Sequence, residues 1–170
     1  GGSQFQSFKG QFSVTGLDAP TILPDTTAIL MFNNCSNFNS DLSNWNTSLV
    51  TSMLGMFQGC TNFNSDISNW NTTNVTSMIN MFQNCTIFNQ NISNWNVSKV
   101  TNMSTMFSGC SAFNQNLSNW DTVGLVTNMS QMFNGCIAYN NNSIALSWPN
   151  LTATVTNMSN MFQNCTIFNQ

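Results

Sequence analysis

The sequence predicts an α/β solenoid of about six 25-residue repeats, with short parallel strands on one face and short helices on the other. Three markers recur in the same order along the chain: a Met-Phe pair, a cysteine and a tryptophan. The steps between successive cysteines are 25, 25, 25, 26 and 29 residues. A fixed period of roughly 20–50 residues is typical of stacked repeats that share one core. The cysteines are Cys35, Cys60, Cys85, Cys110, Cys136 and Cys165.

The apolar spacing before each cysteine predicts the helix of the repeat. In the fourth repeat, Met103, Met106, Phe107 and Cys110 stand at i, i+3, i+4 and i+7. This spacing places them on one face of a helix of about two turns. A helix this short is marginal in water, so we expect it to depend on packing against neighbouring repeats.

The residues at both ends of this segment fit helix caps. Thr101 precedes the apolar set, where its side-chain oxygen can accept an unpaired backbone N–H, and a threonine fills this position in all six repeats. The residue before each cysteine is Gly or Asn, and both types readily adopt the left-handed conformation that ends a helix. We therefore expect the helix of the fourth repeat to end at Gly109.

A short extended segment is expected around each tryptophan, because the helical period is lost there. Phe113, Leu117 and Trp120 mark further apolar columns of the fourth repeat. We expect these columns to point into one continuous apolar interior.

The pattern V-T-N-M-x-x-M-F-x-x-C-x-x-F-N-Q-x-(L/I)-S-N-W-(N/D) resembles the BspA-like leucine-rich repeats. Those repeats occur in surface proteins of bacteria, mycoplasmas, protists and large viruses. The resemblance covers about residues 26–170 and implies an LRR-like right-handed α/β solenoid. It also implies surface exposure, adhesion and binding of host or matrix proteins. The family has no catalytic residues to transfer to this chain.

The chain divides into an N-terminal cap, residues 1–25, and a repeat domain, residues 26–170. The first segment does not follow the repeat, and such a segment can shield the first repeat from water. We expect the array to continue beyond residue 170, or another chain to cover that end, because the last repeat would otherwise expose apolar residues. Insertions near Gly124 and around Trp148 fit either a binding face or neutral variation in loops, and we favour the second.

Charged residues make up only 4% of the chain: two lysines and five aspartates, without Arg, Glu or His. Two cations cannot neutralise a phosphate backbone, which argues against nucleic-acid binding. No apolar run approaches the ~20 residues that span a bilayer. Without His as a base, and with Tyr139 in an apolar column, we expect no enzyme. The sequence predicts no catalytic, cofactor-binding or metal site.

Two columns raise the question of a bound ion or a disulfide. One cysteine per repeat in a fixed position favours a stack of free, buried thiols over disulfides. Asp41 and Asp66 fill one column in successive repeats, and two carboxylates ~5 Å apart could hold Ca²⁺. Asn91 and Asn116 continue that column, so we favour a solvated polar turn.

An asparagine follows the aromatic residue after each cysteine, as Asn114 follows Phe113. We interpret this column as a ladder of amides that satisfies backbone groups in tight turns. The chain also carries N-x-(S/T) sequons, which keep glycosylation open as an alternative use of asparagine. Four of these sequons begin at Asn71, Asn96, Asn102 and Asn116.

These observations predict a non-enzymatic module for adhesion or protein–protein interaction, placed outside the cell, on the cell surface or on a virion. The alternative is a structural component of a larger assembly, such as a virion shell or a surface layer. Protein partners are expected in both cases, with self-association through the last repeat. An array that binds ice or carbohydrate is disfavoured, because no regular Thr-x-Thr face is evident after the tryptophans.

Overall fold

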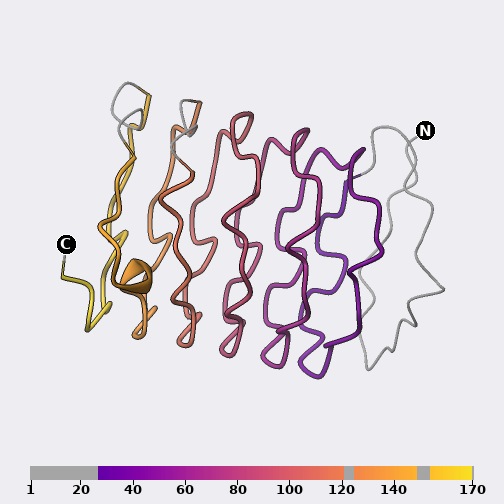
Figure 1. Ribbon diagram of the computed structural model, residues 1–170, viewed down its shortest axis with the longest axis horizontal. Helices are drawn as coiled ribbons and strands as arrows, with labels where there is room; N and C mark the ends of the chain where they lie inside the picture. The colour runs from indigo at the N-terminus through magenta and orange to yellow at the C-terminus, as the bar shows by residue number, and fades with distance from the viewer. Residues whose placement is uncertain (1–26, 121–124, 149–153, 170) are drawn as a thin grey trace.

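The computed structural model describes residues 27–120, 125–148 and 154–169. The repeats lie in a single row in chain order, from the indigo end to the yellow end of Figure 1. We call each repeat a rung and number the rungs one to six. Each rung starts at a residue that forms a bridge to an adjacent rung, so the rungs are 27–51, 52–76, 77–101, 102–127, 128–156 and 157–169.

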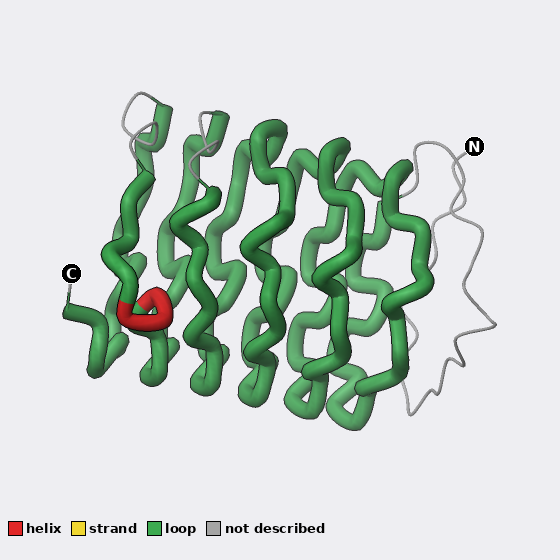
Figure 2. The backbone as a smooth tube through the Cα atoms, viewed as in Figure 1, coloured by secondary structure: helices red, strands yellow, loops and turns green. Residues whose placement is uncertain are grey.

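The predicted α/β solenoid is wrong, because the described residues form neither α-helices nor a β-sheet. The one regular element among them is a 3-10 helix, η1, Asn141–Ser143, drawn red in Figure 2. The parallel contacts between rungs are isolated bridges, and they lie away from the tryptophans where strands were expected. These bridges are Thr27–Ser52, Ser52–Ser77, Ser77–Asn102, Asn102–Asn128 and Asn128–Asn157.

Two successive tight turns replace the predicted helix before each cysteine. In rung four, the Met106 N–H donates to the carbonyl oxygen of Met103, three residues back, at 3.2 Å. Thr105 and Gly109 have left-handed backbone angles, with φ of 55° and 76°. A left-handed residue at every fourth position interrupts a right-handed helix. The conformation predicted at Gly109 is correct, but this residue ends a turn instead of a helix.

The backbone N–H groups explain why the turns form. In the segment before the cysteine of rungs one to five, every second N–H donates to a carbonyl oxygen of the next rung, while the groups between them close turns within the rung. In rung four, the N–H groups that donate to rung five are those of Met103, Thr105, Phe107 and Gly109, and their acceptors are Asn128, Ser130, Met132 and Asn134, at 2.8–2.9 Å. Equivalent bonds recur at all five contacts between described rungs, so these polar groups stay paired without a helix. Gly, Asn, Ser and Thr are poor helix formers, which favours this alternative.

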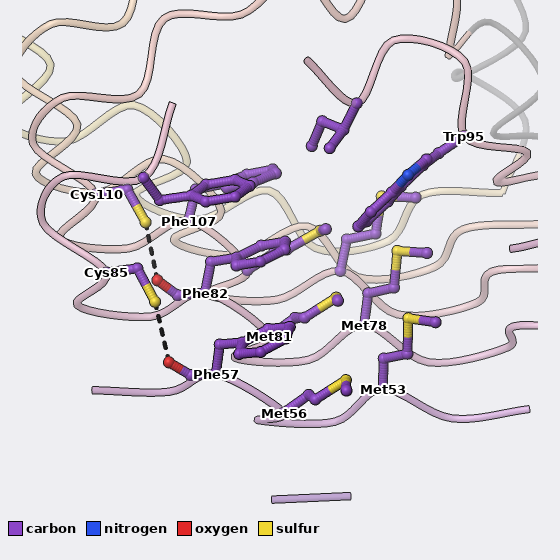
Figure 3. Close-up of a cluster of buried hydrophobic side chains, with 14 of the residues drawn as sticks. Met53, Met56, Phe57, Met78, Met81, Phe82, Cys85, Trp95, Phe107 and Cys110 are labelled. Atoms are coloured by element: carbon purple, nitrogen blue, oxygen red, sulfur yellow. Dashed lines mark hydrogen bonds between the residues drawn. The ribbon is translucent and has the colours of Figure 1, made fainter. Parts of the chain in front are cut away.

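The apolar columns form one continuous core through the rungs, as the sequence predicts. The rings of Phe57, Phe82 and Phe107 stack from rung to rung with centroids 5.7 Å apart. Within a rung, Phe82 stacks on Phe88 at 4.1 Å. Figure 3 shows these rings between the cysteines on the left and the methionines and Trp95 on the right. Because each rung shares its core with both neighbours, no rung buries its apolar residues alone.

The threonine column does not cap helices. Thr101 donates both its backbone N–H and its Oγ1 hydroxyl to the carbonyl oxygen of Thr76 in the preceding rung, at 2.9 and 3.1 Å. The same double contact joins Thr76 to Thr51, Thr127 to Thr101 and Thr156 to Thr127. Threonine therefore recurs because it links rungs on the outside of the stack.

The insertion before Trp148 contains η1. Asn141 is buried there; its Oδ1 accepts the Leu117 N–H at 2.8 Å, and its Nδ2 donates to the Ile144 carbonyl oxygen at 2.8 Å. These contacts fix the extra residues against rung four. The predicted N-terminal cap, residues 1–25, and the insertion near Gly124 lie outside the described residues.

Candidate interaction surface

The cysteines form a column of free thiols, as the sequence predicts. None of the six forms a disulfide; five are buried, and Cys165 is half-buried. From the second cysteine on, each Sγ donates a hydrogen bond to the carbonyl oxygen of the phenylalanine in the preceding rung. Figure 3 shows this contact for Cys85 with Phe57 and for Cys110 with Phe82. The thiols therefore connect rungs inside the core.

Burial keeps these thiols protonated. Burial, with a smaller effect of the neighbouring Cys35 thiol in the same direction, raises the pKa of Cys60 to about 12. Burial also raises the pKa of Cys85 and Cys110 well above the usual value, again with help from adjacent thiols. The pKa of Tyr139 rises for the same first reason, burial. The thiolate is the reactive form of cysteine, so we expect these thiols to be unreactive at neutral pH.

The aspartate column forms polar turns. The Oδ1 of Asp41 accepts the Ser43 N–H, and the Oδ1 of Asp66 accepts the Ser68 N–H, both at 2.9 Å. These hydrogen bonds lower the pKa of both carboxyls. The Oδ1 of Asn91 accepts the Ser93 N–H in the same way, at 3.0 Å. The polar-turn interpretation therefore accounts for this column, and the described residues contain no group of three or more metal-ligating side chains.

In rungs one to four, the asparagine that follows the aromatic residue forms the predicted ladder, but its Oδ1 accepts a hydrogen bond from the next rung. The Oδ1 of Asn64 accepts the backbone N–H of Asn89 at 2.9 Å, and Asn89 accepts that of Asn114 at 2.9 Å. The sequence interpretation placed this contact within the residue's own turn. The ladder therefore adds a further tie between rungs on the outside of the stack.

The four named sequons each place their asparagine in a turn. In each one, the Oδ1 accepts the backbone N–H of the Ser or Thr two residues later. Asn71 and Asn96 are exposed, while Asn102 and Asn116 are partly buried. These contacts give the asparagines a structural role, and glycosylation stays a prediction.

The chain carries an apolar stripe that the sequence analysis missed, at the corner just after each cysteine. The second position after the cysteine reads Asn37, Asn62, Ile87, Ala112, Ala138 and Ile167. Adjacent rungs are joined along this corner, because the Ala112 N–H donates to the Thr86 carbonyl oxygen at 3.0 Å. The sequence signal that could have indicated this stripe was the change from Asn to apolar residues within one column.

We define the apolar stripe as Ile87, Ala112, Ile137, Ala138 and Ile167, on rungs three to six. Its three isoleucines are 46%, 50% and 51% exposed. Rungs one and two carry Asn37 and Asn62 at this corner, whose amides meet at 3.3 Å. Exposed apolar surface aligned along one side of a protein is typical of an interaction site.

The fold and this surface define a class of protein: a stack of turn-rich rungs, tied by hydroxyl and amide ladders, with an apolar stripe along one corner. The chain belongs to the family described as "Mycoplasma protein of unknown function, DUF285", which matches residues 26–148 and 84–170. Comparisons with curated proteins and with solved structures found no match. Among the described residues, no helix has the length and apolar character needed to cross a membrane.

Proposed function

We propose that this chain is a non-enzymatic, surface-exposed repeat module for adhesion or protein–protein interaction, and that it binds its partner through the apolar stripe. The observation that carries the proposal is the exposure of Ile87, Ile137 and Ile167, which lie on rungs three, five and six. Docking a protein there would remove these side chains from water, at roughly 25 cal/mol per Å² of apolar surface buried. The stripe contains no charged residue, so the expected partner surface is apolar and uncharged at its centre.

The resemblance of the repeat to the BspA-like repeats of surface proteins supports a role at a surface. The match to a Mycoplasma family agrees with the resemblance of the repeat to BspA-like repeats of surface proteins. On this proposal the protein lies outside the cell, on the cell surface or on a virion, and its partners are host or matrix proteins. Nucleic acid is not among them, because the chain has only two cations.

The absence of catalysis is part of the proposal. The buried thiols and Tyr139 have raised pKa values, which keep them neutral. Asp41 and Asp66 hold turns through their carboxylates. These side chains therefore have structural roles, and enzymes need such groups tuned and accessible.

The stripe can be tested with substitutions to residues that occupy the equivalent positions of other rungs. Ile87→Asn and Ile167→Asn copy Asn37 and Asn62, and Ile137→Thr copies a threonine of the neighbouring column. The triple variant should keep its melting temperature and lose at least tenfold in affinity for any partner found in a panel of matrix and host-surface proteins.

A matched control alters another exposed corner. Leu49 and Leu125 are 40% and 53% exposed, and their column contains Asn74 and Lys99. The double variant Leu49→Asn, Leu125→Lys should bind as the parent does. Equal affinity of the parent and the stripe variant would refute the stripe as the binding site, and measurable turnover of a substrate would refute the non-enzymatic role.

The second candidate function is a structural component of a larger assembly, such as a virion shell or a surface layer. The observation that favours it is the low charge of the chain, 4%, together with exposed asparagines such as Asn71 and Asn96, which suit polar contacts between neighbouring copies. Imaging of the native particle or cell surface distinguishes the two. Ordered, stoichiometric copies support assembly, and sparse copies support adhesion.

A further inference from the structure

Four N-x-(S/T) sequons of rungs one to three present their asparagine to solvent in the same way. In each of them the asparagine is exposed and the residue after it is buried. The buried residue anchors the tripeptide to the core, and the asparagine and the Ser or Thr on either side of it lie at the surface. We call these four tripeptides the outward sequons. Their asparagines are Asn46, Asn71, Asn91 and Asn96.

Each of these four carboxamides uses its oxygen in a turn and leaves its nitrogen free. The Oδ1 of Asn96 accepts the Ser98 N–H at 3.0 Å and the Ser98 hydroxyl at 2.7 Å. The other three Oδ1 atoms accept the N–H of the Ser or Thr two residues later, at 3.0–3.1 Å. None of the four Nδ2 atoms donates to an acceptor within the described part of the chain. A group attached to Nδ2 would therefore leave these turns intact.

Sequons elsewhere in the described residues lack one of these features, as three examples show. Asn74 is exposed, but its Nδ2 donates to the Ser48 carbonyl oxygen at 2.9 Å. Asn102 is only partly exposed. Asn141 is fully buried, and its Nδ2 donates to the Ile144 carbonyl oxygen at 2.8 Å. The structure thus separates asparagines that the sequon pattern alone treats as equivalent.

The free Nδ2 is the atom that bonds to a sugar in N-linked glycosylation. The anomeric carbon of the sugar bonds to Nδ2, and its bond to a diphosphate oxygen breaks. The diphosphate leaves with the bonding electrons, and Nδ2 gives up one proton. An accessible Nδ2 that no acceptor holds suits this step. A separate transferase supplies the catalysis, so the step asks for no catalytic residue in this chain.

We propose that the asparagines of the outward sequons are acceptor sites for N-linked sugars from a glycosyl diphosphate. Asn46, Asn71 and Asn96 each follow a tryptophan, and those tryptophan rings stack from rung to rung at 6.3–6.5 Å. Sugars on these asparagines would form a row along one edge of the stack. Such a row would separate neighbouring copies at this edge, so occupied sites favour adhesion over a packed assembly. The sites share no residue with the apolar stripe and do not depend on it.

The test measures sugar occupancy at each asparagine by mass spectrometry of proteolytic peptides. In one arm, the folded chain is incubated with a nucleotide diphosphate sugar and a soluble N-glycosyltransferase. In the other, the chain is secreted from a eukaryotic cell, where the donor is a lipid-linked oligosaccharide. Sugar in one arm only assigns the donor to that source. In the arm that gives sugar, we expect occupancy at Asn71 and Asn96 at least tenfold above that at Asn74 and Asn102.

Unfolded peptides are the matched control for the first arm. A peptide of residues 67–79 contains both Asn71 and Asn74, and one of residues 92–106 contains both Asn96 and Asn102. A transferase preparation that modifies both asparagines of each peptide is chosen, so that any selectivity in the folded chain comes from its structure.

Ser98→Ala removes the sequon hydroxyl but keeps the backbone N–H that closes the turn. This variant should keep its melting temperature and lose at least tenfold in occupancy at Asn96. The proposal is overturned if neither arm gives sugar at the outward sequons, or if Asn74 and Asn102 are occupied as fully as Asn71 and Asn96. The triple stripe variant should be glycosylated as the parent is, so failure of the proposed function leaves this test intact.

Discussion

The Sγ of Cys110 donates a hydrogen bond to the carbonyl oxygen of Phe82, 2.8 Å away in the preceding rung. Both residues are fully buried, and the contact recurs at every rung from the second to the sixth. The cysteine column is therefore a row of protonated thiols that act as donors. Deprotonation of a thiol would remove its hydrogen bond and leave a negative charge buried in the core. This relationship ties the stability of the stack to pH.

The stack should lose stability in alkali. Unfolded thiols ionise near pH 8.5. Because burial raises the folded pKa, to about 12 for Cys60, the thiols contribute stability below about pH 8.5 and lose it as pH rises toward 12. Melting temperatures measured from pH 7 to 10.5 should fall above pH 8.5. The Cys85→Ala, Cys110→Ala variant should fall less steeply, and an equal slope would contradict the assignment.

Phe107 should be the costliest single truncation in rung four. Its ring is fully buried and stacks on Phe82, Phe113 and Phe133. Phe107→Ala should lower the free energy of unfolding by ~3–5 kcal/mol, because it leaves a cavity that two neighbouring rungs share. Urea unfolding measures the loss, with Ile87→Ala as an exposed control expected within ~0.5 kcal/mol of the parent.

Gly109 should tolerate a side chain only if Asn84 is removed. Its φ is 76°, and a Cβ built there would overlap the Oδ1 of Asn84. Gly109→Val should destabilise the protein for both reasons, because a β-branched residue resists left-handed angles. Gly109→Asn should avoid most of the backbone strain of the valine variant but keep the overlap with Asn84. The double variant Asn84→Gly, Gly109→Asn removes that overlap as well, so it should recover most of the lost stability. A double-mutant cycle of melting temperatures without coupling would refute the contact.

Thr105→Asn should stabilise the protein. Thr105 holds a φ of 55°, which costs a β-branched residue ~1–3 kcal/mol. Asn80 and Asn160 occupy the same position in rungs three and six with nearly the same φ, and asparagine tolerates this region. We expect a gain of ~1 kcal/mol in thermal unfolding. Ser104→Asn, one residue earlier, serves as the control and should give no such gain.

The aspartate turns should weaken only in acid. The hydrogen bonds from Ser43 and Ser68 lower the folded pKa of Asp41 and Asp66, so their contribution is present above the unfolded value of ~3.9. This contribution to stability is lost as the pH falls below ~4 and passes the lowered pKa of the carboxyls in the folded protein. Replacing both by Asn keeps the turn, as Asn91 shows, and should remove this part of the acid sensitivity. Acid titrations followed by circular dichroism compare the two proteins.

Part of the interior could be predicted from the sequence because it depends on side-chain character alone. The 25-residue period, the stacked aromatic columns and the free thiols follow from residue types that recur in register, such as Cys85 and Cys110. The amide ladder was predicted for the same reason, although its acceptor role toward the next rung was not. The apolar stripe was not predicted, because its column also contains Asn37 and Asn62 and has no uniform residue type.

The backbone path was decided only by the tertiary structure. Apolar residues at i, i+3, i+4 and i+7, such as Met103 and Cys110, face one side in a helix and equally in two successive tight turns. Which one forms depends on where alternate N–H groups find acceptors, and these lie about 25 residues away in the next rung. Left-handed angles at Thr105, which sequence propensity disfavours, are held by those bonds. The sequence by itself determined the period and the core of this protein, and contact between rungs determined its backbone conformation.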